Sequence, residues 1–66
     1  MQILVNGDSV EVASGLSLLA LLERIGKPSA HVAVEYNGDI LERDGFAAVT
    51  LRENDRLEIV HFVGGG

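Results

Sequence analysis

Cysteine and tryptophan are absent from this sequence of 66 residues, and proline occurs once. The lack of cysteine excludes disulfides, cysteine-ligated zinc and thiol catalysis within the chain. The longest apolar run, residues 18–22, is far too short to span a bilayer. The N-terminal residues do not show the charged segment and following apolar segment that are typical of a signal peptide. We therefore expect a cytoplasmic protein with no membrane partner.

Lysine and arginine are also scarce: five basic residues stand against ten acidic ones, giving a formal net charge of −5. Aromatic residues make up only 5% of the chain, and no basic stripe runs through it. We therefore expect no nucleic-acid partner, because phosphate binding and base stacking need those features. Solubility is the simplest reason for the acidic excess, and attraction to a basic partner is the more specific alternative.

Side chains suited to metal binding or acid–base catalysis do not gather along the sequence. His31 and His61 lie far apart, with no third ligand at a metal-binding spacing. Four acidic residues closer together are interpreted as solvated turn residues: Glu35, Asp39, Glu42 and Asp44. We expect no metal site, and no cofactor bound by the chain itself.

The apolar pattern predicts a small α+β domain. Residues 1–12 alternate as two strands around Asn6-Gly7, a pair that favours tight hairpin turns. Residues 18–25 have the spacing of an amphipathic helix, capped by Ser17 and ended by Gly26. The stripe predicted to face the core consists of Leu18, Leu21, Leu22 and Ile25, with Leu19 at its edge.

The second half predicts further strands at residues 32–36, 40–41 and 57–63, with a turn at Asn37-Gly38. Residues 42–50 lack a clean period and are predicted to be mostly loop, with Phe46 as an apolar plug. The order β-β-α-β-(β)-β indicates a β-grasp, or ubiquitin-like, fold. We expect a mixed sheet of four to five strands covered by one main helix, with the last strand parallel to the first.

Three glycines follow the last predicted strand, so we assign residues 1–63 to the domain and 64–66 to a flexible tail. Glycine costs much backbone entropy to order, but a tail without Cβ atoms fits a channel too narrow for side chains. Gly64 and Gly65 would thread such a channel and present the α-carboxylate of Gly66. A cloning remnant or simple fraying is the alternative.

The last strand also suggests a docking surface. If Leu57, Ile59 and His61 share the core-facing side, Val60 and Phe62 face solvent beside the tail. Leu4 extends this patch if the first and last strands pair. Scattered exposed apolar residues are common, but the position beside the tail favours partner docking.

With these features the chain resembles the thiamine-biosynthesis sulfur carrier family, ThiS. The resemblance covers essentially the whole chain, through residues 1–7, 18–22 and 32–38 and through Arg43 with Phe46, where the family usually has tryptophan. Its most specific part is residues 55–60, with the sequence DRLEIV, together with the glycine end. Three glycines stand where the family needs two.

The resemblance implies that the chain is a sulfur carrier, a protein co-substrate and not itself an enzyme. An E1-like adenylyltransferase (ThiF-like) would activate the Gly66 carboxylate with MgATP. A persulfide sulfur donor would then convert the acyl-adenylate into a thiocarboxylate. Thiazole synthase (ThiG-like) would use that sulfur to build the thiazole ring of thiamine.

Three other functions fit the same features less well. The small subunit of molybdopterin synthase shares the fold and terminal chemistry, but the short chain and the Glu58-Ile59-Val60 ending favour the thiamine carrier. A ubiquitin-like modifier would be joined to lysines through Gly66. A passive β-grasp binding module would leave the glycines unmodified.

Overall fold

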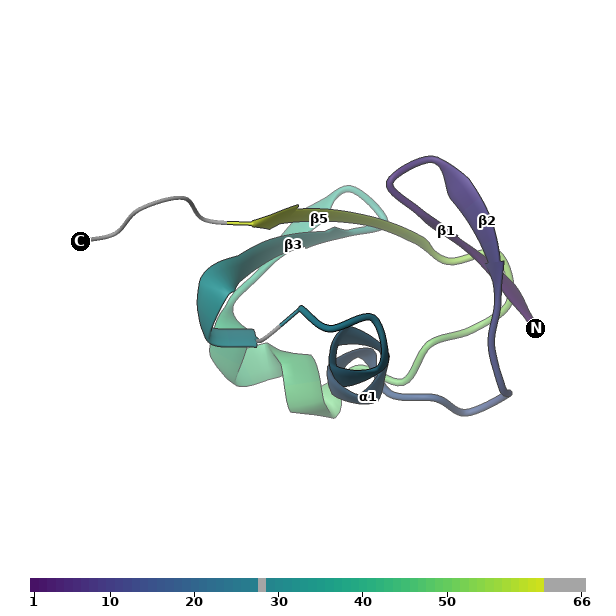
Figure 1. Ribbon diagram of the computed structural model, residues 1–66, viewed down its shortest axis with the longest axis horizontal. Coiled ribbons are helices and arrows are strands. Elements are labelled where there is room, and N and C mark those ends of the chain that lie inside the picture. Colours follow the sequence, from purple (N-terminus) through teal and green to yellow (C-terminus); the bar gives the residue numbers. More distant parts are fainter. Residues whose placement is uncertain (28, 62–66) are drawn as a thin grey trace.

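The computed structural model describes residues 1–27 and 29–61, which form one sheet, one α-helix and two short 3-10 helices (Figure 1). In chain order the elements are β1 (Gln2–Val5), β2 (Asp8–Glu11), α1 (Leu18–Arg24), η1 (Ser29–His31), β3 (Val32–Tyr36), β4 (Asp39–Leu41), η2 (Arg43–Ala48) and β5 (Arg56–His61).

The five strands form one mixed sheet in the order β2-β1-β5-β3-β4. β1 and β5 run parallel, while the other neighbouring pairs are antiparallel. α1 lies against one face of this sheet, and η1 and η2 flank it on the same side (Figure 1). The predicted β-grasp fold is confirmed, including the parallel pairing that brings the last strand beside the first.

Both Asn-Gly pairs form tight turns, as the sequence predicts. Asn6 and Gly7 have φ angles of 51° and 86°, and Asn37 and Gly38 have φ angles of 49° and 92°. Asparagine and glycine enter this left-handed region more readily than other residues. The chain can therefore reverse within two residues between β1 and β2 and between β3 and β4.

α1 begins and ends near the predicted positions. The Ser17 hydroxyl accepts a hydrogen bond of 3.1 Å from the backbone N–H of Ala20, as an N-cap should. The prediction for Ile25 is wrong. The helix ends at Arg24, Ile25 leaves helical geometry as the C-cap, and its side chain is 39% exposed.

One apolar core lies between α1 and the sheet. Strand alternation and the spacing of the helix predict core positions at Ile3, Val5, Leu21, Leu22, Leu57 and Ile59. All of them are buried except Val5, which is half-buried. The remaining buried apolar residues are Val12, Leu18, Val32, Val34, Phe46 and Leu51. Of these, Val12 follows β2 and Leu51 lies between η2 and β5, while the others belong to named elements.

The prediction of loop for residues 42–50 is wrong in part, because η2 occupies six of them. A 3-10 helix has three residues per turn, and η2 buries only Phe46, so no repeat of apolar residues marks it. The role predicted for Phe46 is confirmed, since its side chain is 1% exposed and belongs to the core. Among the described helices, none is long and apolar enough to cross a membrane.

Candidate functional site

β5 is the central strand of the sheet and leads directly to the predicted tail. It pairs with β1 through Arg56 and Leu57, and with β3 from Leu57 to His61. Its inner residues Leu57 and Ile59 are 2% and 6% exposed, as predicted. Residues 62–66 lie outside the described part of the chain, and so do the predicted site residues Phe62, Gly64, Gly65 and Gly66 and the boundary after residue 63.

Asn6 holds β5 beyond the end of β1. The backbone N–H of Ile59 donates to Asn6 Oδ1 at 2.6 Å, and Asn6 Nδ2 donates to the Ile59 carbonyl at 3.2 Å. The Asn6 side chain therefore supplies the two hydrogen bonds that a further residue of β1 would have made. This role is additional to the turn that the sequence predicted for Asn6.

Asn37 holds the beginning of β5 from the other side. Its backbone N–H donates to the Arg56 carbonyl, and its Oδ1 accepts from the Arg56 N–H, both at 2.8 Å. The two turn asparagines thus hold β5 at Arg56 and at Ile59. A strand held in this way gives the residues that follow it a defined starting point.

Asp55, just before β5, is a buried carboxylate whose side chain is fully hydrogen-bonded. It accepts from Tyr36 Oη at 2.7 Å, from the Arg52 N–H at 2.7 Å and from Asn37 Nδ2 at 3.2 Å. Burial by itself raises the pKa of Asp55, but these hydrogen bonds and the Arg52 charge outweigh burial and hold the pKa below its usual value. The hydrogen bond from Tyr36 to Asp55, together with burial and the negative charge of Asp55, raises the pKa of Tyr36.

The sequence indicates Asp55 only as the first residue of the segment 55–60 that resembles the family, and the structure shows that it organises the approach to β5. Its three donors come from β3, from the turn after β3 and from the segment before β5. We interpret this network as structural, because its buried polar atoms all have partners and none of its four residues lines one of the hollows of the described chain.

Val60 lies on the outer face of the sheet, as predicted, and its side chain is 61% exposed. Leu4 is also on this face and 37% exposed. However, Leu4 lies opposite Arg56, and Val60 is four positions beyond Arg56 on β5, about 13 Å along a strand. Leu4 therefore does not touch Val60, although both residues share one face.

Two other apolar residues, not predicted as site residues, lie closer to Val60. Ala33 is its direct partner on β3, and Ile40, on β4, is 79% exposed. These three residues line a shallow hollow of about 270 Å³, whose remaining walls are Val34, Glu35 and Glu58. The sequence could have revealed the position of Ile40. A two-residue turn at Asn37-Gly38 sets Ile40 opposite Glu35, and paired residues lie on the same face of a sheet.

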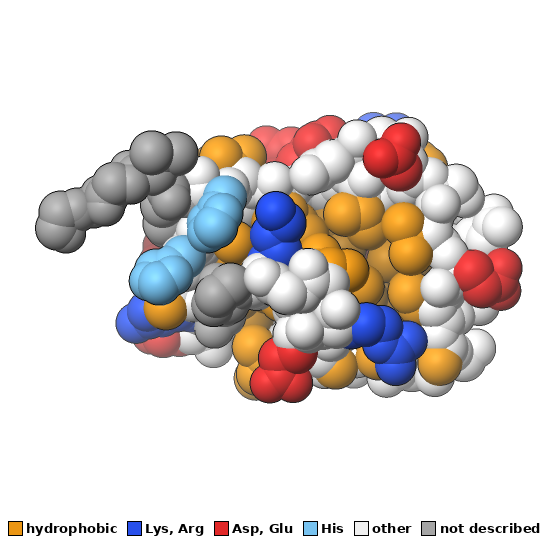
Figure 2. All heavy atoms as spheres, viewed as in Figure 1, with side chains coloured by type: hydrophobic (Ala, Val, Ile, Leu, Met, Phe, Trp, Pro, Cys, Tyr) orange, Lys and Arg blue, Asp and Glu red, His pale blue; other side chains and the backbone are white. Residues whose placement is uncertain are grey.

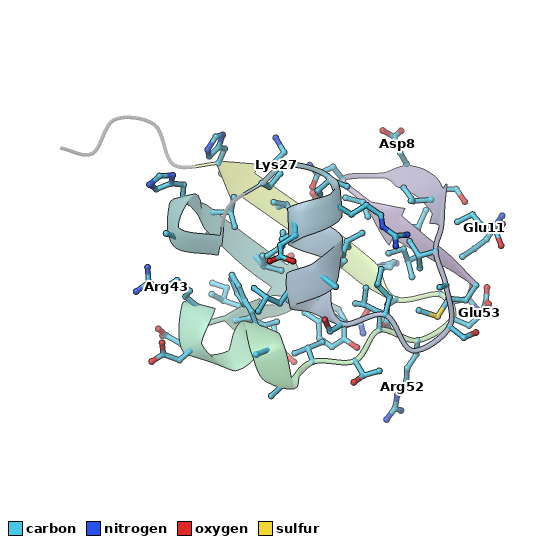
Figure 3. The ribbon with its side chains drawn as sticks, turned by 60° about the horizontal axis from the view of Figure 1, so that its bottom comes forward. Asp8, Glu11, Lys27, Arg43, Arg52 and Glu53 are labelled. Carbon is cyan, nitrogen blue, oxygen red and sulfur yellow. The ribbon has the colours of Figure 1, made fainter. Side chains whose placement is uncertain are left out.

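The two histidines, predicted not to form a site, lie at the end of the sheet where β5 leaves it. Their ring centroids are 6.5 Å apart, and both side chains are exposed and adjoin in Figure 2. Lys27, after α1, extends on the same side of the molecule (Figure 3). Within the described residues no group of three or more His, Cys, Asp or Glu is placed to hold a metal, so the pair lacks the third ligand of a typical zinc site.

A wider hollow of about 470 Å³ lies beside β4 and is lined by Glu42, Arg43 and Asp44 among others. All three charged side chains are exposed. Solvated charges around an open hollow are typical of a protein surface. The candidate site is therefore the outer face of β3, β4 and β5, where Val60 is exposed.

Comparison with known proteins places the chain in one family. The model of the ThiS family matches residues 3–66. The crystal structure of the thiamine biosynthesis protein ThiS from Geobacter metallireducens superposes with a TM-score of 0.84 at 38% identity, and the match covers all of both chains. The sulfur carrier protein ThiS of Escherichia coli is 29% identical over the full length of both chains.

The chain also matches part of a larger enzyme. It is 41% identical over 66 residues to a thiazole synthase of Magnetococcus marinus and 38% identical to that of Paramagnetospirillum magneticum. The whole chain is covered in each match, but it spans only 20% of the length of either enzyme.

Proposed function

The chain belongs to the ThiS family of sulfur carrier proteins, and from this premise we propose that it carries sulfur as a thiocarboxylate on Gly66. The observation that carries the proposal is the family match, which continues beyond the folded domain through the glycine end to residue 66. A match confined to the fold would be compatible with any β-grasp protein. Only residues 62 and 63 separate the glycines from the end of the central strand at His61, which supports the same conclusion.

The chemistry follows from the poor reactivity of a carboxylate. Adenylylation with MgATP on a partner enzyme would give the Gly66 carbonyl a good leaving group. A persulfide sulfur would then attack the carbonyl carbon and displace AMP, and a thiol would cleave the sulfur–sulfur bond to leave the thiocarboxylate. Glycine has no side chain to hinder this attack. All catalytic groups in this scheme belong to partner proteins, so the chain serves as a co-substrate.

The folded domain would hold the carboxylate at a fixed reach from the partner. β5 is hydrogen-bonded on both sides up to Ile59 and pairs with β3 up to His61. Residues 63–66 span about 14 Å when fully extended, at roughly 3.5 Å per residue. That length suffices to reach a recessed active site while the domain remains outside, docked through Val60 and, we propose, Phe62 and Leu4.

Two classes of partner are proposed. An E1-like adenylyltransferase would activate Gly66, and a thiazole synthase would consume the sulfur. The second assignment is supported by the two larger thiazole synthases, each of which contains a segment similar to this whole chain. The part shared with this chain would then serve as the sulfur-bearing segment of the same reaction.

Intact mass spectrometry tests the proposal. The protein is incubated with the adenylyltransferase of the same organism, MgATP and a persulfide donor, and we expect one oxygen to be replaced by sulfur at the C-terminus. Deleting Gly66 should abolish the product, because the carboxylate would end about 3.5 Å short of the attacking sulfur. Gly65→Val keeps the length but adds a branched side chain, and it should also block the reaction.

Both variants should unfold like the wild type, which separates a tail effect from a folding defect. Normal thiocarboxylate formation by both variants would disprove the role of the tail. Isopeptide conjugates of Gly66 on other proteins, without a thiocarboxylate, would indicate a protein modifier instead.

A further inference from the structure

The hollow around Val60 combines exposed apolar side chains with two carboxylates. In the pairing of β3 with β5, Ala33 faces Val60 and Glu35 faces Glu58. In the pairing of β3 with β4, Glu35 faces Ile40. Apolar side chains and two acidic groups therefore border the same recess on the sheet face opposite α1 (Figure 1).

This arrangement does not serve the stability of the free domain. Like charges directly opposite each other on neighbouring strands are destabilising. Neither Glu35 nor Glu58 forms an ion pair with any residue in the described part of the chain. Ile40 and Val60, at 79% and 61% exposure, contribute little to the core. The recess is thus better suited to a contact surface than to a structural role.

The strand base nearest to the two carboxylates does not pair with them. Arg56 lies two residues before Glu58 on the same face of β5 and lines a neighbouring hollow with it, but it forms no ion pair with Glu58 in the described part of the chain. The formal net charge of the chain, −5, adds a long-range preference for a positively charged partner.

We propose that this recess binds an arginine or lysine side chain, flanked by an apolar residue, on the surface of the activating adenylyltransferase. An arginine fits well, because its planar guanidinium can donate to two carboxylates at once. The methylene groups of the same side chain would lie against Ile40 and Val60. The inference rests on the function proposed above and names the chemistry of the docking contact.

The adenylyltransferase is the partner to which the charge pattern points. An enzyme that transfers a phosphoryl-linked group from ATP concentrates lysine and arginine around its active site. The tail has to enter that site from β5, and the recess lies on the outer face of β5 close to where the tail begins. The enzyme surface beside the entrance is therefore where a basic side chain would meet Glu35 and Glu58.

The test measures binding of the full chain to the adenylyltransferase of the same organism by surface plasmon resonance over a series of salt concentrations. The variant Glu35→Gln with Glu58→Gln keeps the shape of the recess and removes its charge. We expect its Kd to rise about fivefold or more at low salt, mainly through slower association. The difference should shrink as salt increases, because screening at about 1 M limits charge interactions to roughly 3 Å.

The matched control is Asp8→Asn with Glu23→Gln, which removes the same net charge elsewhere. Asp8 is on β2, at the far end of the sheet from β4, and is labelled in Figure 3, while Glu23 is on α1. We expect this control to change the Kd by less than about twofold at physiological salt. Ile40→Ser should weaken binding as well, without lowering the melting temperature, because Ile40 is exposed.

Thermal unfolding separates a docking role of Glu35 and Glu58 from a structural one, because loss of a structural role would lower the melting temperature. Relief of the opposed charges should leave the glutamine variant at least as stable as the wild type. Equal affinity of the glutamine variant and the wild type, an equal loss in the control, or a lower melting temperature of the glutamine variant would each overturn the inference. Thiocarboxylate formation, measured on the same wild-type sample, shows separately whether the proposed function holds.

Discussion

Replacing the buried carboxylate before β5 should cost a large share of the stability of this domain. Asp55→Ala removes the acceptor of three hydrogen bonds, donated by Tyr36, Asn37 and the Arg52 N–H. A hydrogen bond to a charged group contributes about 1.5–3 kcal/mol, and water can replace part of what the exposed donors lose. We therefore expect a loss of about 3 kcal/mol, against a total of roughly 3–10 kcal/mol for a domain of this length.

The effect should depend on pH in a defined direction. The folded state lowers the pKa of Asp55, so its contribution is fully present above the ordinary aspartate pKa of about 3.9. That contribution is lost as the pH falls below this value and through the folded pKa. The pKa of Tyr36 is raised, so its contribution is present below the ordinary tyrosine pKa of about 10 and is lost as the pH rises through the folded value.

Urea unfolding followed by circular dichroism measures this loss for the wild type and Asp55→Ala, at neutral pH and at a series of values down to about pH 3. Tyr36→Phe is the control, because it removes one donor and should cost about 1–2 kcal/mol. A loss below about 0.5 kcal/mol for Asp55→Ala, or a gap between the two proteins that does not narrow in acid, would refute the reasoning.

Three further substitutions test the core, the strand anchor and the outer face. Leu22→Ala should lower the unfolding free energy by about 2–5 kcal/mol in the same urea assay, because the side chain is fully buried; a change of a few tenths would contradict the assignment of the helix face. Asn6→Gly keeps the positive φ but loses both hydrogen bonds to Ile59, and should cost about 1–3 kcal/mol in that assay. Unchanged stability would mean that the asparagine serves the turn alone. Val60→Ser should leave the melting temperature nearly unchanged while weakening adenylyltransferase binding, and unfolding of this variant would show that Val60 is part of the core.

The sequence alone determined the fold because its local signals agree with one another. Each Asn-Gly pair demands positive φ angles, and each lies between alternating segments, so two hairpins follow directly. The stripe of leucines with Ser17 before it and Gly26 after it marks a single helix. The helix and the sheet each have one apolar face, so the helix must cover the sheet. The buried face of β5 follows from the alternation that places Leu57 and Ile59 on the same side.

Short elements without a repeat escaped the sequence-based prediction. η2 buries one residue, Phe46, and a single buried position carries no period. Ile25 continues the leucine spacing, but the helix ends before it, so spacing alone misplaced it. For Ile25 the end of the helix, which depends on packing and capping, decided the outcome.

Only the tertiary structure decided which distant side chains meet. Asn6 reaches Ile59, and Asn37 reaches Asp55, because β5 inserts between β1 and β3 and brings both turns to its sides. The same insertion sets Glu35 opposite Glu58 and places Val60 and Ile40 around one hollow, and it brings the rings of His31 and His61 together. Local propensities fix backbone geometry over a few residues, whereas the register between strands far apart in the chain is set by the packing of the whole core.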